Sequence, residues 1–522
     1  MRRRRGALLA APLAVGLLLA ACSGKGGGSP VSGGTLKVSV RDLGSLDPAT
    51  TTGGGGPLVV AQLFDSLTKI DPSTGRAKSS AASSWTVSAD GLTWTFTIAP
   101  ATFHDGTPVT AADFKAAFDR IAAKATGSEI AFQLEAVHGF HAAKIDGTAS
   151  GLDGVQAVDA TTLKIVLDRP FDELPVFLAD PSLAPLPKAM IANPALLQSQ
   201  PVGNGPFKMA GPRTPDKVML ERFDGHAGHK AYLDKVEVDL NGDATQAWRD
   251  FLAKRTDVAE VPSDAIADSA GKAGTGGFTP RWAALYYGLN LHSPVFVKGT
   301  LRLAVSLAID RKHIADSVFG GTKEPATAII PRGVRGFQEG LCPVCEQNQD
   351  RARQLIQETF GNKPPELIID HIDAPTSQDV ATSVAADLKD VGINAALRAH
   401  KSGDYLKFLQ SGQAEIIELG WISDVPSPDA YLEHQLGGDS VDNHTGYGDA
   451  KFDSLIDKAR AASDETARLD FYRQAEAQSY AAMPLIPIVF YRNHIGVADR
   501  VHGLLVDGAG IFDAAQVWVD HS

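Results

Sequence analysis

Apolar residues recur at two different spacings along this chain, and only a mixed α/β fold accommodates both. They form short, mostly alternating runs at 36–40, 94–98 and 163–167, which predicts strands. They recur every three or four residues at 110–124, 301–309 and 452–459, which predicts amphipathic helices, and Thr110 and Asp113 match a capping box at the start of the first helix. In the second half, strand candidates at 367–369 and 416–419 alternate with a helix at 380–389. That half is therefore predicted to be an α/β lobe, with its ligand edge at the strand ends.

The N-terminal segment has the pattern of an export signal. Residues 2–5 are all arginine, and the apolar run at 7–20 is shorter than a membrane span requires. The run ends in LAACSG at 19–24, which resembles a bacterial lipobox, in which Cys22 receives a lipid and becomes the new N-terminus. An ordinary signal peptide that contains a cysteine is the alternative. We expect residues 1–21 to be the signal peptide, 22–32 to be a flexible tether, and the mature palmitate-bearing lipoprotein to be anchored at the outer face of the cell membrane.

Composition limits the possible partners. The 522 residues include 49 Lys and Arg against 61 Asp and Glu, and four of the arginines lie in the leader. A surface this acidic repels phosphates, so we expect no nucleic-acid partner. At about 150 residues per domain, the length allows about three lobes with a cleft between them.

Two of the three cysteines form a close pair. Cys342 and Cys345 remain if Cys22 is lipidated, and an oxidising compartment favours a disulfide between them. A redox motif is the alternative, but redox chemistry of this kind requires a helix N-terminus, whereas the turn-rich residues 331–340 precede this pair. We therefore predict a small structural disulfide.

Several motifs occur in an order that resembles one protein family. They are LDP (46–48), QLFDSL (62–67), SADGLTWTF (88–96), FHDGTPVTAADF (103–114), VGNGPF (202–207), LAVSLAIDR (303–311), the segment 420–432 that begins Gly-Trp, and FDSLID (452–457). Each motif alone is weak, but together they resemble the extracellular solute-binding proteins, family 5, of bacterial ABC importers, which bind dipeptides, oligopeptides or nickel chelates. The resemblance covers residues 34–491.

The resemblance implies an α/β fold with two lobes, the type II (cluster C) periplasmic-binding-protein fold. Lobe I would comprise residues 33–60, 203–289 and 488–522, with an inserted subdomain at 61–202. Lobe II would comprise residues 290–487. The implied function is capture of a solute by a monomer, which then docks on a membrane permease. The solute would be a peptide, of oligopeptide length, or another amine-bearing molecule.

One motif carries most of the site prediction. Asp424 follows an apolar strand candidate in Gly420-Trp421-Ile422-Ser423-Asp424, where open α/β sheets bind ligands. In peptide-binding relatives the matching Asp accepts the peptide's α-ammonium. Desolvating this carboxylate is costly unless the ligand brings a cation. Trp421 would add an apolar wall, and Ser423 belongs to the same motif; a turn cap for Asp424 and a core position for Trp421 are the alternatives. Asp429 is predicted to be the N-cap of a helix at 430–436.

Other candidate ligand contacts rest on the resemblance. Tyr447 lies in a loop that faces the cleft in relatives, and Gly55 and Gly56 belong to a glycine run that borders it and lacks the Lys-Ser/Thr of a P-loop. Asn290 lies at the crossover between lobes, as a hinge or as a ligand contact. His371 stands in a segment where dipeptide-specific relatives place an arginine, so a dipeptide clamp is in doubt and a longer peptide or a non-peptide ligand is favoured.

No catalytic or cofactor motif is present. The pairs His138/His141 and His226/His229 suggest a metal, but no cysteine or carboxylate beside them has zinc-like spacing. Lipase-type, zincin and dinucleotide motifs are missing. We therefore predict a binding protein with no cofactor and no metal site. A receptor for metal chelates or other non-peptide solutes is the first alternative, and a cell-envelope enzyme is the second.

Overall fold

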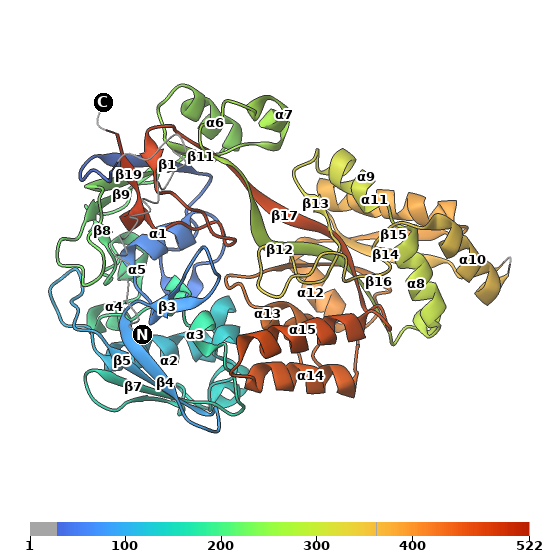
Figure 1. Ribbon diagram of the computed structural model, residues 1–522, viewed down its shortest axis with the longest axis horizontal. Helices are drawn as coiled ribbons and strands as arrows, with labels where there is room; N and C mark the ends of the chain where they lie inside the picture. The colour runs from blue at the N-terminus through green and yellow to red at the C-terminus, as the bar shows by residue number, and fades with distance from the viewer. Residues whose placement is uncertain (1–28, 362, 521–522) are drawn as a thin grey trace, which may run out of the picture.

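A computed structural model of the protein describes residues 29–361 and 363–520, so the predicted leader and Cys22 lie outside the described residues. Helices and strands alternate along these residues, which confirms the mixed α/β prediction. Figure 1 shows two bodies joined by the long strands β12 (Gly277–Leu289) and β17 (Leu485–Val497).

The largest sheet of the described residues has eleven strands and extends through both bodies. Its order is β15-β14-β16-β12-β17-β11-β1-β10-β9-β8, with β13 beside β17. One half contains β13 (Glu324–Pro325), β14 (Leu367–Ile372), β15 (Ala395–His400) and β16 (Ile416–Ile422). The other half contains β1 (Thr35–Val40), β8 (Phe207–Met209), β9 (Lys217–Arg222), β10 (Lys235–Leu240) and β11 (Val258–Glu260). Because β12 and β17 lie at the centre, they connect the two halves.

Helices cover the second body. They are α8 (Gly299–Ala308), α9 (Arg311–His313), α10 (Gln349–Phe360), α11 (Pro375–Asp390), α12 (Ser402–Gln410), α13 (Asp429–Leu436), α14 (Ala450–Ala461) and α15 (Glu465–Ser479). The helical stripes predicted at 380–389 and 452–459 fall within α11 and α14, and the stripe at 301–309 coincides with α8 except for Ile309, which is its C-cap. These three predictions are confirmed, because the apolar face of each helix is buried.

A separate four-stranded sheet lies in the first body (Figure 1), in the order β4-β5-β7-β6. Its strands are β4 (Ala82–Val87), β5 (Thr93–Ile98), β6 (Val155–Ala157) and β7 (Thr162–Val166). The helix α2 (Ala111–Ala122) begins with the predicted capping box of Thr110 and Asp113. The remaining elements of this body include α1 (Gly56–Leu63), β2 (Thr68–Ile70), β3 (Ala77–Ser79), α3 (Leu174–Phe177), α4 (Lys188–Ala192), α5 (Ala195–Ser199), α6 (Ala244–Leu252), α7 (Ile266–Ser269), β18 (Val501–His502) and β19 (Trp518–Val519).

The two bodies touch through a buried ionic network. Glu173, at the start of α3, is fully buried and pairs with Arg335 and accepts a hydrogen bond from Ser427. Arg335 also pairs with Glu465 at 2.9 Å. A carboxylate this deeply buried requires cationic partners, so these contacts hold the bodies together in the described conformation.

Two predictions near the end of β16 need correction. The strand runs to Ile422, so Gly420 and Trp421 belong to it and do not follow it. Asp429 is the first residue of α13, and Pro428 occupies the N-cap. The Asp429 carboxylate accepts two hydrogen bonds from Arg460, at 2.7 and 2.8 Å, and one from Tyr472 at 3.0 Å. The N-cap prediction for Asp429 was therefore wrong, because a buried arginine takes up the carboxylate.

This correction can be tested by stability. Arg460 is only 6% exposed, so Asp429→Ala removes the carboxylate that accepts its two hydrogen bonds and leaves the buried guanidinium with Glu433 alone, at 3.3 Å. We expect a loss of about 3–5 kcal/mol in the free energy of unfolding, measured by denaturant titration. Asp464→Ala is the control, because Asp464 caps α15 by accepting from Ala467, and its loss should cost about 1 kcal/mol. Equal losses in the two variants would contradict the buried-pair interpretation.

Candidate functional site

A cavity of about 510 Å³ lies where the two bodies meet. Its walls come from the loop and helix at 51–64, from segments at 66–78, 129–132 and 179–182, from the C-terminal segment 503–516, and from Arg281, Ile422 and Asp424. A volume of this size is in the range of small-ligand sites. Most of the wall therefore comes from the first body, while Arg281 comes from β12 and Ile422 and Asp424 come from the end of β16 and the turn after it.

Asp424 faces this cavity two residues after the end of β16. The turn that presents it is held by Ser423, whose backbone N–H donates to the Trp282 carbonyl at 2.9 Å. The Ser423 hydroxyl is fully buried, donates to the Val425 carbonyl at 2.8 Å and accepts from the Val425 N–H at 3.2 Å. Ser423 thus fixes the turn so that Asp424 faces the cavity. The side chain of Ser423 itself does not line the cavity.

The Asp424 carboxylate has no hydrogen bond and no ion pair with any residue in 29–361 or 363–520. Its side chain is exposed at the cavity. The surrounding protein partly desolvates the carboxylate, and together with the nearby negative charges of Asp180 and Asp507 this raises the pKa of Asp424 to about 7, while Arg281 lowers it only in part. An empty cavity therefore disfavours the ionised form.

Two of the other carboxylates at the cavity wall act on Asp424, and both have protein partners. Asp180 accepts from Gln133 Nε2 at 2.5 Å and from the Ser182 N–H at 2.8 Å, and burial raises its pKa. Asp507 accepts from the N–H groups of Ala509 and Ile511 at 3.0 and 2.9 Å, and burial raises its pKa to about 6. Of the three, Asp424 is the one whose carboxylate accepts no hydrogen bond from the described residues.

The glycine run lies beside the cavity, although a different part of it forms the wall. Gly53 and Gly54 line the cavity with left-handed φ values of 67° and 64°. Gly55 and Gly56 stand at the start of α1, where an added Cβ on Gly56 would lie 2.4 Å from the Ser45 carbonyl oxygen. Gly55 and Gly56 are therefore needed for close packing of the loop, and contact of either with ligand stays a prediction.

Trp421 lies outside the residues that line the cavity. Its ring stacks on His434 with centroids 5.3 Å apart and meets the edge of Phe132 at 6.1 Å. Phe132 itself lines the cavity. Trp421 thus supports the wall through Phe132, and its direct contact with a ligand stays a prediction.

Tyr447, Asn290 and His371 also lie outside the cavity lining. Tyr447 is buried and packs its ring against Phe452 at 5.4 Å. Asn290 follows β12, donates to the carbonyls of Gly412 and Ala414 at 3.0 and 2.7 Å, and accepts from the His292 N–H. His371 is buried within β14. These contacts are those of structural residues, and the predicted ligand contacts of all three remain untested.

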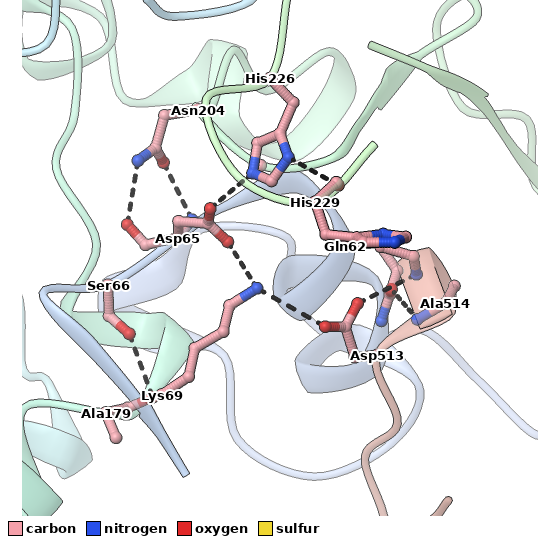
Figure 2. A network of polar contacts seen from close by, with 12 residues as sticks. Gln62, Asp65, Ser66, Lys69, Ala179, Asn204, His226, His229, Asp513 and Ala514 are labelled. Carbon is pink, nitrogen blue, oxygen red and sulfur yellow. Dashed lines mark hydrogen bonds and ion pairs between the residues drawn. The ribbon is translucent and has the colours of Figure 1, made fainter. Parts of the chain in front are cut away.

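A polar network behind one wall of the cavity holds Lys69 in place (Figure 2). Lys69 lines the cavity, and its Nζ lies 2.8 Å from Asp65 and 3.8 Å from Asp513. Burial opposes the charge of Asp65, but Lys69 and His226 outweigh it and hold the pKa of Asp65 well below its usual range. His226 Nε2 lies 2.7 Å from the second oxygen of Asp65. Lys69 is thus neutralised by protein carboxylates.

The histidine pairs have other partners in the structure. His226 contacts Asp65 and the His229 carbonyl, His138 contacts Asp168, and His141 contacts Asp146. No group of three or more potential metal ligands occurs within the described residues. Cys342 and Cys345 lie in a loop, as predicted, with their sulfurs 2.12 Å apart.

Comparison with known proteins assigns the family. Residues 77–443 match the family model described as "Bacterial extracellular solute-binding proteins, family 5 Middle". This match covers more than half of the chain. The protein belongs to this family, and its fold is the two-lobed type II periplasmic-binding-protein fold, as the motif resemblance predicted.

Relatives of the chain include named receptors. It is 25% identical to "Oligopeptide-binding protein OppA" of Bacillus subtilis, over 97% of this chain and 98% of that one. It is 28% identical to "Probable deoxycholate-binding periplasmic protein YgiS" of Escherichia coli, over 86% of each. Among solved structures, the open, unliganded form of the MppA periplasmic murein tripeptide binding protein matches with a TM-score of 0.80 and 25% identity, over 93% of this chain and 98% of that one. The family and these relatives are binding proteins.

Sequence reasoning missed the charged residues that surround Asp424. Asp180, Asp507 and Arg281 come from three distant segments, and no local motif marks any of them. Only the structure shows why Arg281 is there: in the pairing of β12 with β16, Ala283 lies opposite Ile422. Continued by two residues, this register brings Arg281 opposite Asp424.

Proposed function

We propose that this protein is the extracytoplasmic receptor of an ABC importer and captures peptides by their free α-ammonium group. Asp424 carries the proposal, because it is an unpartnered carboxylate in the cavity between the two bodies. A ligand ammonium would restore the partner that the carboxylate lacks. The names of peptide-binding relatives support the same substrate class.

The charge of the cavity argues against an anionic ligand without an amine. Near the turn of Asp424 there are three carboxylates, of Asp180, Asp424 and Asp507, and one guanidinium, of Arg281. A bile acid of the kind named for one relative would bring a carboxylate and no cation to this region. Such a ligand would therefore be repelled unless Asp424 stayed protonated.

Capture requires that the ligand bind the closed arrangement better than an open one. We propose that the first lobe comprises residues 33–60, 203–289 and 488–522, with an insertion at 61–202. The second lobe would comprise residues 290–487. We propose that the two lobes move relative to each other about β12 and β17. The Glu173–Arg335 contact joins the insertion to the second of these lobes. A monomer in its closed form would then dock on the permease.

We further propose that Cys22 is lipidated and that Cys342 and Cys345 form a disulfide in the exported protein. The lipobox-like sequence supports the first, and the positions of the two sulfurs support the second. No helix in the described part of the chain is both long and apolar enough to cross a membrane. The lipid is therefore the proposed attachment.

The anchor can be tested by detergent phase partitioning. We expect Cys22→Ser to move the protein from the detergent phase to the aqueous phase, because the acyl chains supply the membrane affinity. The double variant Cys342→Ser/Cys345→Ser is the matched control and should still partition with detergent. A Cys22→Ser protein that stays in the detergent phase would refute lipidation at this residue.

The function can be tested with a double-mutant cycle in which the ligand is one partner. Asp424→Ala should weaken binding of a free-amine tripeptide by about 3–5 kcal/mol, or two to four decades, because the ligand cation loses its partner in a desolvated site. Asp424→Asn should weaken binding of the peptide nearly as much, since the amide keeps the shape and loses the charge. N-acetylating the peptide should abolish its binding to the wild type and should lower its affinity for the variants much less.

Calorimetry supplies the affinities for this cycle. Asp439→Asn, which changes an exposed carboxylate outside the cavity lining, is the control and should bind like the wild type. Wild-type affinity in Asp424→Ala, or equal sensitivity of all proteins to N-acetylation, would remove the support for amine recognition.

A further inference from the structure

Arg281 lines the cavity next to Asp424 and has no ionic partner among the described residues. It lies on β12, where the pairing with β17 is irregular between Pro280 and Ala284. Bulges of this kind redirect side chains near binding sites. Arg281 lies in this irregular stretch, outside the regular pairing of β12 with β17, and its side chain lines the cavity.

The backbone next to Arg281 is tied to both acidic segments of the cavity. The Trp282 N–H donates to the Gly508 carbonyl at 2.8 Å, next to Asp507. The Trp282 carbonyl accepts from the Ser423 N–H at 2.9 Å, next to Asp424. Arg281 is thereby held beside the turn that presents Asp424, while no nitrogen of Arg281 comes within 4.0 Å of the Asp424 carboxylate oxygens.

On its other side, Arg281 meets cations and no free carboxylate. Lys323 stacks over the Tyr491 ring at 4.3 Å, and burial together with Arg281 and Arg492 lowers the pKa of Lys323 to about 8, against a smaller opposing effect of Glu260. Arg492 already has Glu324, at 3.4 Å. The cations near Arg281 therefore make the local potential positive at the same cavity wall that carries Asp424.

We propose that Arg281 binds an anionic group of the ligand close to the ammonium held by Asp424. An unpaired guanidinium and an unpaired carboxylate on one wall are complementary to a ligand that carries both charges close together. The anionic group is a carboxylate, which a planar guanidinium binds with two hydrogen bonds. It belongs either to an acidic first residue of a peptide or to the C-terminus of a very short peptide. This inference rests on the proposed function, since it assumes that Asp424 receives an amine.

The experiment compares ligands that differ in one charge. The affinity of Glu-Ala-Ala is measured against Gln-Ala-Ala, and that of Ala-Ala against Ala-Ala-amide, by calorimetry. In the wild type we expect at least one pair to show a preference of about tenfold for the carboxylate. The first pair reports a side-chain carboxylate and the second reports the C-terminus, so the two sources are distinguished.

The variant Arg281→Gln should remove that preference or reverse it, because the added carboxylate then meets Asp180, Asp424 and Asp507 alone. Its affinity for Gln-Ala-Ala should be retained, which shows that the site is still folded. Lys78→Gln is the matched control, since Lys78 is an exposed cation that lines the same cavity, and it should keep the wild-type preference. Arg281→Lys should keep part of it.

Four results would overturn the inference. If the carboxylate preference is the same in Arg281→Gln and the wild type, or if neither pair shows a preference, Arg281 does not bind the anion. If Lys78→Gln loses the preference instead, the anion binds elsewhere in the cavity. If no free-amine peptide binds the wild type, the proposed function fails and this inference fails with it.

Discussion

The antiparallel pairing of β12 with β16 and β17 decides where the charged groups of the cavity lie. This pairing makes one sheet from two bodies, so the segments after β16 and along β12 meet at the junction. The same register that places Ala283 opposite Ile422 places Arg281 and Asp424 at one wall. The hydrogen bonds of Trp282 to Ser423 and Gly508 then hold the acidic turns beside them.

The electrostatics of the cavity follow from this arrangement. Most buried charges of the protein have partners: Glu173 has Arg335, Asp429 has Arg460, and Asp65 has Lys69. Within residues 29–361 and 363–520, Asp424 and Arg281 have none, although each lies near other charged groups. Unpaired charges at a cavity wall lower the stability of the empty protein and become favourable when a ligand supplies the complementary charges. The contrast between paired and unpaired groups is what separates the candidate site from the structural ion pairs.

Sequence patterns predicted the mixed α/β fold, most of the strands and helices, and the capping box of Thr110 and Asp113, because these depend on local spacing. They also placed Asp424 after a strand of the second body. They were wrong about Asp429, since its partner Arg460 lies 31 residues away and only tertiary packing brings them together. Arg281, Asp180 and Asp507 were missed for the same reason. Trp421, Ser423 and Asn290 were singled out by motif, and the structure shows packing or hydrogen bonds for each of them that no local pattern reveals.

The central claim is that Asp424 is an uncompensated carboxylate that a ligand ammonium stabilises. The most direct measurement is thermal unfolding of the wild type and Asp424→Asn between pH 4 and pH 8, with and without a free-amine tripeptide. The pKa of Asp424 is about 7 in the folded protein against an ordinary value of 3.8, so the empty folded state retains a proton that the unfolded chain releases. The wild type should therefore lose stability relative to Asp424→Asn as the pH rises from about 4 to about 7, with no further loss above. The peptide should close or reverse this gap, because it stabilises the ionised wild type selectively. A gap that is independent of pH, or a peptide that stabilises both proteins equally, would contradict the account.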